Sequence, residues 1–147
     1  MDGAKHGNHE NKKIALAFVN AINSHDIDKI YAFMADDHVF VDAYGNETGK
    51  NAMKQGWAGY FSWFPDYRIE VDDVLGSGDT VVLLGHAGGT YKGSSALCDT
   101  RHWRIPAAWR VVIDKKKIKI WQVYADSKIP FDSMNGDDKS TGESKTP

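Results

Sequence analysis

The segment KIKIWQVYAD, residues 117–126, predicts a β-strand that ends on a carboxylate. Alternate residues of a strand lie on the same face of a sheet, so Gln122, Tyr124 and Asp126 should point to one side. A carboxylate on a buried face costs free energy unless it is hydrogen-bonded or has a chemical task. Asp126 is therefore a candidate catalytic group, with a structural role as the alternative.

Three further segments upstream have a strand pattern. They are YRIEVDDVLG (67–76), TVVLLGHAGGTYKG (80–93) and AAWRVVID (107–114). A Gly-Ser-Gly-Asp turn separates the first two, and an Asp-Lys-Lys-Lys turn separates the third from the strand at 117–126. Consecutive strands joined by short turns predict an antiparallel sheet. The segment GSSALCDTRHWRIP, from Gly93 to Pro106, is expected to form a long loop.

Helical patterns come before these strands. One amphipathic helix is expected over residues 10–24, and a second short helix should begin after Asp26 as its N-cap. A strand at HVFVDAYG (38–45) follows, and a third helix over 49–64 should end at Pro65. Helices on one face of an antiparallel sheet make an α+β domain.

The composition restricts the possible functions. The 147 residues suit one domain, which we place at 9–132, with disordered tails at 1–8 and 133–147. Eighteen basic and twenty acidic residues without a basic stripe do not favour a nucleic-acid partner. A single cysteine, no signal-peptide pattern and no long apolar segment indicate a cytoplasmic location and no membrane partner.

The order of elements resembles the SnoaL-like proteins of the nuclear transport factor 2-like, or ketosteroid isomerase-like, superfamily. The resemblance covers about residues 10–132 and depends on three segments. They are DIDKIYAFMADDHVFVDAYGNETGK, FPDYRIEVDDVLGSGDTVVLLGHAGGTYKG and KIKIWQVYAD. It implies a cystatin-like cone, in which a curved antiparallel sheet wraps around three helices and leaves a pocket at its open end. It also implies a homodimer formed through the sheet. It does not fix an activity, because this fold hosts cyclases, isomerases, hydrolases and binding proteins.

The resemblance gives Asp126 a possible catalytic role. It matches the acid that SnoaL-type polyketide cyclases use for an intramolecular aldol closure, and a similar acid in limonene epoxide hydrolase. A carboxyl group in an apolar pocket has a raised pKa, which suits proton transfer. Tyr124 would then donate a hydrogen bond to a substrate oxygen, and Gln122 is a further polar candidate. In the alternative interpretation, Asp126 caps or orients the neighbouring loop.

Asp42 is the second candidate acid, because ADDHVFVD is similar to the ketosteroid isomerase segment that ends in its proton-shuttling aspartate. That family also needs two oxyanion donors. Phe18 stands where the family has a tyrosine, and Ala107 or Ala108 stands where it has an aspartic acid. The isomerase activity is therefore not favoured, and Asp42 is expected to hold the YGNETG turn.

The strand at 80–93 does not provide the charged pair of an epoxide hydrolase. Its inward set should be small or neutral, and consists of Leu83, Gly85, Ala87, Gly89 and Tyr91. His86 falls on the opposite face, and the histidines do not form a metal-ligand pattern, so no metal is expected. The remaining pocket candidates are apolar. They are Phe18, Phe40, Trp57, Phe61, Ala87 and Trp109.

These observations predict a mostly apolar pocket. The favoured function is cofactor-independent acid/base chemistry on a small hydrophobic or polyketide-like molecule, with Asp126, Tyr124 and Asp42 as the catalytic candidates. One alternative is a binding module without catalysis. Another is a structural dimer whose cone is filled by its own tryptophans.

Overall fold

Six strands form one mixed sheet in the order β2-β1-β6-β5-β4-β3. The computed structural model describes residues 2–92 and 102–134. The strands are β1 (Met34–Val41), β2 (Glu47–Gly49), β3 (Arg68–Ser77), β4 (Thr80–Thr90), β5 (His102–Asp114) and β6 (Lys117–Ala125). β1 pairs with β6 in parallel, and every other neighbouring pair is antiparallel. The antiparallel prediction thus holds for the consecutive strands from β3 to β6, and the parallel pair joins strands that are far apart in the sequence.

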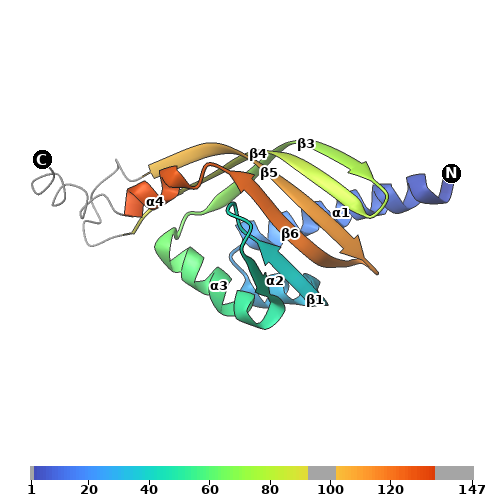
Figure 1. Ribbon diagram of the computed structural model, residues 1–147, viewed down its shortest axis with the longest axis horizontal. Helices are drawn as coiled ribbons and strands as arrows, with labels where there is room; N and C mark the ends of the chain where they lie inside the picture. The colour runs from blue at the N-terminus through green and yellow to red at the C-terminus, as the bar shows by residue number, and fades with distance from the viewer. Residues whose placement is uncertain (1, 93–101, 135–147) are drawn as a thin grey trace, which may run out of the picture.

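Three helices lie beneath the arched sheet (Figure 1). They are α1 (Asp2–Asn23), α2 (Ile27–Phe33) and α3 (Lys50–Trp63). α1 packs against β3, β4 and β5, while α3 packs against β1 and β2. This arrangement confirms the predicted α+β class with a curved sheet over three helices.

A fourth helix, α4 (Lys128–Met134), follows β6 and packs against β5. The sequence pattern did not predict it, because seven residues are too few for a clear helical period. The described residues extend beyond both ends of the expected 9–132 domain, since α1 begins at Asp2 and α4 ends at Met134. The part of the predicted tail at 135–147 lies outside the described residues.

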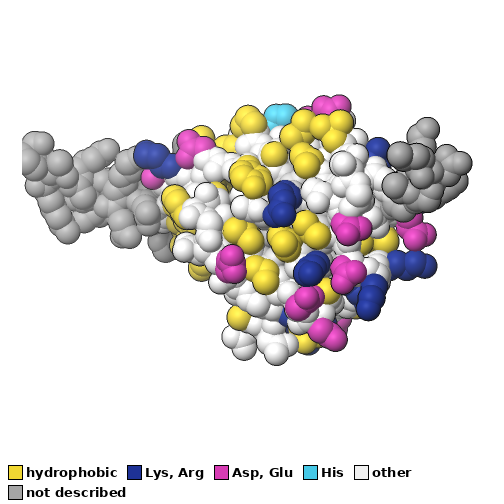
Figure 2. All heavy atoms as spheres, turned by 45° about the vertical axis from the view of Figure 1, so that its right-hand side comes forward, with side chains coloured by type: hydrophobic (Ala, Val, Ile, Leu, Met, Phe, Trp, Pro, Cys, Tyr) yellow, Lys and Arg dark blue, Asp and Glu magenta, His cyan; other side chains and the backbone are white. Residues whose placement is uncertain are grey.

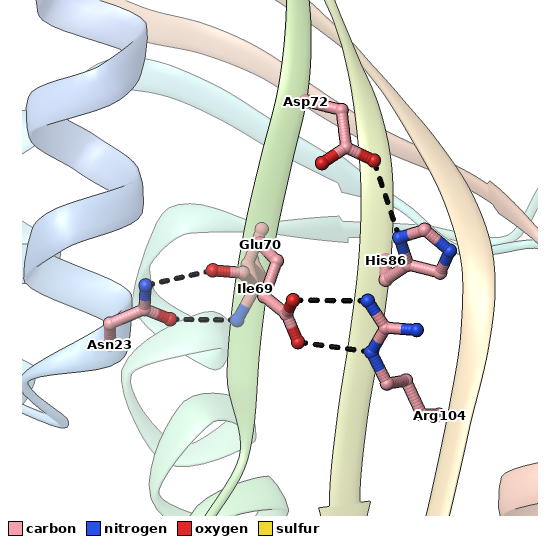
Figure 3. A network of polar contacts seen from close by, with 6 residues as sticks. All are labelled: Asn23, Ile69, Glu70, Asp72, His86 and Arg104. Carbon is pink, nitrogen blue, oxygen red and sulfur yellow. Dashed lines mark hydrogen bonds and ion pairs between the residues drawn. The ribbon is translucent and has the colours of Figure 1, made fainter.

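The two ends of the α1–α2 connection are fixed by side chains. Asp26 is the N-cap of α2, as predicted, and its Oδ1 accepts a hydrogen bond from the Lys29 backbone N–H at 3.1 Å. At the end of α1, Asn23 forms two hydrogen bonds with the backbone of Ile69 in β3, as Figure 3 shows. Its Nδ2 donates to the carbonyl at 2.9 Å, and its Oδ1 accepts from the N–H at 2.8 Å. α1 is thereby held to β3 by directional bonds as well as by packing.

A β-bulge in β3 leaves no space for a side chain at Gly85 of β4. The pairing between β3 and β4 shifts register between Val71 and Asp73, opposite Gly85. A Cβ atom at Gly85 would collide with the carbonyl oxygen of Glu70. The sheet can therefore take this local shape only with glycine on β4 at that point.

Alternation along β4 and β5 follows the predicted faces. Leu83 and Ala87 are buried on β4, and Trp109, Val111 and Ile113 are buried on β5. These side chains point toward the helices and form much of the core.

The predicted loop from Gly93 to Pro106 is wrong in its last part, because β5 begins at His102. Trp103 and Ile105 continue the buried alternation of the strand, which explains why the strand extends through Pro106. The part of the loop at 93–101 lies outside the described residues.

The surface carries charges of both signs. Figure 2 shows acidic and basic side chains interspersed, mostly at the lower right of the visible face, and hydrophobic side chains over its upper part. In the described part of the chain, no helix is both long and apolar enough to cross a membrane.

Candidate functional site

A cavity of about 420 Å³ lies between α3 and the inner face of the sheet. This volume falls within the usual range of small-molecule sites. Phe40 of β1 and Thr48 of β2 line the cavity from the sheet, and three neighbouring strands contribute seven further lining residues. They are Ala87 of β4, Trp103, Ile105 and Trp109 of β5, and Trp121, Val123 and Ala125 of β6.

The opposite wall is formed by α3 and the residues that follow it. The lining residues of this wall are Met53, Gly56, Trp57, Tyr60, Trp63 and Tyr67. Their rings contact one another edge to face, as Tyr60 does with Trp57 at 6.3 Å and with Tyr67 at 4.9 Å between centroids. Edge-to-face contact is a preferred geometry of aromatic pairs, so these contacts stabilise the wall.

Three partly exposed aromatic residues mark the open end of the cavity. Tyr44, Trp63 and Phe131 all line it and are 69%, 43% and 40% exposed. They come from the β1–β2 turn, the end of α3 and α4, respectively. The exposed aromatic part of the lining therefore comes from three segments that are separate in the sequence.

Asp42 lines the cavity but its carboxylate is occupied by the turn that carries Tyr44. Asp42 Oδ1 accepts hydrogen bonds from the backbone N–H groups of Tyr44 and Asn46, each at 2.9 Å, and Oδ2 accepts from Asn46 Nδ2 at 3.1 Å. Partial desolvation raises its pKa, but these hydrogen bonds outweigh that effect and the net pKa is lowered. The predicted structural role of Asp42 in the turn is confirmed.

Asp126 does not lie in the cavity. It is exposed, and its Oδ1 accepts a hydrogen bond from the Lys128 backbone N–H at 3.0 Å, at the start of α4. The cavity face of β6 consists of Trp121, Val123 and Ala125, so the expected orientation of this strand is wrong. The physical reason is that burying the large apolar Trp121 gains more free energy than burying the polar residues of the other face, Gln122 and Tyr124.

Tyr124 and Gln122 lie on the outer face of the sheet. Tyr124 is 52% exposed, and Gln122 Oε1 accepts a hydrogen bond from Arg110 at 3.2 Å. The structure therefore does not bring Asp126, Tyr124 and Gln122 together with Asp42 at one site.

The apolar candidates divide into cavity and core. Phe40, Trp57, Ala87 and Trp109 line the cavity, as expected. Two others belong to the core instead. Phe18 is fully buried against Phe33 and Trp121, and Phe61 stacks on His25 at 4.0 Å between ring centroids.

Tyr60 and Tyr67 are cavity residues that the sequence interpretation did not assign to the site. Burial raises the pKa of both phenols, and for Tyr67 the proximity of Tyr60 raises it further. Neither hydroxyl has a hydrogen-bond partner among the described residues. A tyrosine on the apolar face of the helix at 49–64 was the available signal, because a buried phenol needs a partner for its hydroxyl.

Two indole N–H groups in the same walls are also without a partner. Trp57 Nε1 and Trp103 Nε1 are buried and make no hydrogen bond within the described residues. Asp42 is the one charged side chain among the described residues that line the cavity. The cavity lining is thus mainly aromatic, and its polar side chains are phenol, indole and hydroxyl groups with one carboxylate.

Two histidines, His38 in β1 and His86 in β4, make contacts within the sheet. His38 Nδ1 lies 2.8 Å from the Ile118 carbonyl oxygen, so this nitrogen carries the hydrogen and donates it. His86 is on the outer face, as predicted, with Nδ1 3.4 Å from Asp72 Oδ2 (Figure 3). Within the described residues, no cluster of three or more His, Cys, Asp or Glu side chains could hold a metal ion.

Comparisons with known proteins agree with this architecture. The family model described as a SnoaL-like domain matches residues 15–121. A putative SnoaL-like polyketide cyclase from Shewanella denitrificans has a similar structure, with a TM-score of 0.72 and 15% identity over 86% of this chain and 97% of that one. No curated protein sequence matches.

Two further solved structures extend the comparison. An LEH-like epoxide hydrolase from M. tuberculosis has a TM-score of 0.71 and 16% identity over 86% of this chain and 90% of that one. A hypothetical protein from Catenulispora acidiphila with a ketosteroid isomerase-like fold, solved in complex with trimethylamine, has a TM-score of 0.66 and 21% identity. That match covers 76% of this chain and 83% of the other. At these identities, the likeness shows a shared fold.

Proposed function

Because the chain belongs to the SnoaL-like domain family, we propose that it binds a small, largely apolar molecule in the cavity between α3 and the sheet. The observation that carries this proposal is the cavity itself, with a volume of about 420 Å³ and walls made mainly of aromatic side chains. Sites that hold small organic ligands have this size and this apolar character.

The neighbouring structures support a ligand-binding use of the fold. The Catenulispora acidiphila protein holds trimethylamine, which is a small organic molecule. Other neighbours include a putative polyketide cyclase and an epoxide hydrolase. Binding of a small organic molecule is common to these functions, whereas the chemistry differs among them.

The geometry favours binding over the acid/base chemistry of a cyclase. General acid/base catalysis requires a titratable group within hydrogen-bond reach of the substrate. Asp126 and Tyr124 are outside the cavity, and both Asp42 carboxylate oxygens accept hydrogen bonds from the turn. The proposal therefore assigns these carboxylates to the segments at the cavity opening, and the catalytic role of Asp126, Tyr124 and Asp42 stays a prediction.

The binding proposal can be tested by filling the cavity from the sheet side. Ala87 faces the cavity from β4, so Ala87→Phe should occupy part of the space that a ligand needs. We expect the wild-type protein to bind the neutral fluorescent probe N-phenyl-1-naphthylamine with a stoichiometry near one, and Ala87→Phe to weaken binding at least about tenfold, equivalent to about 1.4 kcal/mol. Ala58→Phe adds the same side chain at an exposed position of α3 and should bind like the wild type.

Three results would contradict the proposal. They are no probe binding by the wild-type protein, equal binding by wild type and Ala87→Phe, and equal loss in both variants. Circular dichroism and a thermal melt would establish that each variant is folded before its affinity is compared.

The outer face of the sheet supports the homodimer expected from the resemblance. Leu84, Ala108 and Tyr124 are cross-strand neighbours on β4, β5 and β6, and Leu84 and Tyr124 are 37% and 52% exposed. Exposed apolar side chains gathered on one face are typical of protein interfaces. The homodimer and the cytoplasmic location both stay predictions.

A further inference from the structure

We propose that the cavity selects ligands that carry a carbonyl or similar acceptor oxygen, which the phenol groups of Tyr60 and Tyr67 bind by hydrogen bonds. This inference rests on the proposed binding function, and it specifies the ligand class. The two tyrosines come from different segments, since Tyr60 lies in α3 and Tyr67 lies just before β3.

Their arrangement places both phenols at one part of the cavity wall. The ring centroids are 4.9 Å apart and the ring planes make an angle of 86°. Both side chains line the cavity, and Tyr67 is only 7% exposed. Tyr67 is also fixed by its backbone, because its carbonyl oxygen lies 2.8 Å from His25 Nε2 and its N–H donates to the Phe64 carbonyl at 3.0 Å.

The hydroxyl groups of these two residues have an unmet hydrogen-bonding capacity. By contrast, the Tyr31 hydroxyl in α2 donates to Asn51 Oδ1 at 2.9 Å. The hydroxyls of Tyr60 and Tyr67 make no hydrogen bond among the described residues. A phenol that makes no hydrogen bond within the protein can donate one to a ligand, so a ligand that provides the acceptor gains affinity from this site.

The rest of the lining defines the kind of acceptor. Asp42 is the only charged lining residue among those described, and its two oxygens accept hydrogen bonds from the adjacent turn. No lysine, arginine or histidine is among the described lining residues, so an anionic ligand would find no counter-charge. A neutral molecule with an aromatic or alicyclic body and a carbonyl oxygen matches both the apolar walls and the free donors.

Burial reinforces the donor role. It raises the pKa of Tyr60 and of Tyr67, so both phenols keep their protons throughout the physiological pH range. They therefore remain hydrogen-bond donors under all ordinary conditions.

A pair of isosteric probes tests this selectivity. 2-Acetylnaphthalene and 2-ethylnaphthalene have nearly the same shape and differ in a carbonyl oxygen in place of two hydrogens. We expect the wild-type protein, measured by isothermal titration calorimetry, to bind the ketone about tenfold more tightly than the hydrocarbon, as one or two neutral hydrogen bonds would give. Tyr60→Phe and Tyr67→Phe should each reduce this preference, and the double variant should abolish it.

Infrared spectroscopy provides a readout that a purely structural role would not move. The carbonyl stretch of ¹³C-labelled 2-acetylnaphthalene should move to lower frequency on binding to the wild-type protein, relative to the ketone in hexane. This shift should decrease in each single variant. Tyr124→Phe removes a hydroxyl from the outer face and serves as the matched control, with an unchanged preference and an unchanged frequency.

The outcomes separate the two proposals. Failure of both probes to bind the wild-type protein overturns the binding function together with this inference. Equal binding of both probes, or a carbonyl frequency equal to that in hexane, overturns only the inference. A preference that persists in the double variant, or that is lost in Tyr124→Phe, also overturns the role of Tyr60 and Tyr67. If the double variant does not fold, the single variants decide the question, since a wild-type preference and carbonyl frequency in both Tyr60→Phe and Tyr67→Phe overturn the role of these residues.

Discussion

Asp126 Oδ1 accepts a hydrogen bond from the Lys128 backbone N–H at 3.0 Å, so this carboxylate holds the start of α4. α4 carries Phe131, which lines the cavity at its open end. A side-chain oxygen bonded to a backbone N–H two residues later stabilises a turn, and Asn can replace Asp in that role.

Asp126→Ala should loosen α4, whereas Asp126→Asn should not. We expect Asp126→Ala to lower the local free energy of opening by about 1 kcal/mol, because one hydrogen bond at a helix start is lost. Amide hydrogen exchange at Lys128 and Phe131 would measure this effect. An Asp126→Asn protein that keeps its fold and exchange rates but loses a measured enzymatic turnover would contradict the structural assignment.

Gly85 is expected to tolerate no larger residue. Gly85→Ala places a Cβ against the Glu70 carbonyl oxygen at the bulge, and we expect a loss of about 1–3 kcal/mol in the free energy of unfolding. Urea denaturation would measure it.

Gly59→Ala is the matched control for this substitution, with the opposite sign. Gly59 lies within α3, and no heavy atom lies within 4 Å of a Cβ built on it. Alanine should therefore stabilise the helix by about 0.5–1 kcal/mol. Equal effects of the two substitutions would show that the bulge does not require glycine.

Acid should weaken the β1–β2 turn through Asp42. Its folded-state pKa is below the ordinary value of 3.8 because of the hydrogen bonds to Asn46 and Tyr44. A lowered carboxyl pKa stabilises the native state above about pH 4, and this contribution is lost as the pH falls through the folded pKa. Urea midpoints between about pH 5 and pH 2.5 should fall less steeply for Asp42→Asn than for the wild type. Asp73→Asn, at an exposed position of β3, is the control and should follow the wild-type curve.

His38 should add a second pH dependence, nearer to neutrality. Burial lowers its pKa below the ordinary value of 6.5, and this outweighs the opposing hydrogen bond to Ile118. The unfolded chain then takes up a proton at His38 before the native state does, so stability falls as the pH drops below about 6.5, by at most about 1.4 kcal/mol per pH unit.

His38→Asn keeps a donor near the position of Nδ1 and removes the titration. We expect a less stable protein with a flatter dependence of unfolding free energy on pH between about 5 and 7. His9→Asn changes an exposed histidine of α1 and should leave the dependence as in the wild type. An unchanged slope in His38→Asn would show that other groups cause it.

A charge on the outer face of the sheet should separate the proposed dimer. Leu84→Lys places an ammonium group among Ala108 and Tyr124, where pairing with a second copy would bury it. Sedimentation velocity should show a dimer for the wild type and a monomer for the variant. Ile129→Lys introduces the same charge at an exposed position of α4 and should remain dimeric. A wild-type protein that is monomeric at tens of micromolar would refute the dimer.

The elements with a clear hydrophobic period were predicted correctly from the sequence. The prediction failed where the buried face of an element depends on contacts with residues that are distant in the sequence. The alternation of Ala107, Trp109 and Val111 identified the buried face of β5, and Asp26 identified the start of α2. The orientation of β6 was wrong because both of its alternate sets contain an aromatic residue. The pairing of Trp109 with Trp121 in the core, at 6.1 Å between ring centroids, decides which set is buried, and a single strand does not reveal it.

The sequence predicted only part of the cavity lining, again because some properties of the site depend on the folded environment. Phe40, Trp57, Ala87 and Trp109 were identified by burial patterns, and they do line the cavity. Tyr60 and Tyr67 were missed, because the lack of a hydroxyl partner is a property of the folded environment. Asp42 holds the β1–β2 turn and Asp126 holds the start of α4. The turn residues after Asp42 can be recognised in the sequence, whereas the short helix after Asp126 cannot.

The double hydrogen bond between Asn23 and Ile69 has a consequence for how this protein can associate. The amide of Asn23 occupies positions on β3 that the backbone of an added strand from another chain would need. At the opposite border of the sheet, β2 has only three residues and offers a very short template. Growth of the sheet sideways, as in fibril formation or strand exchange, is thus disfavoured at both borders, and copies of the chain have the broad outer face left for association.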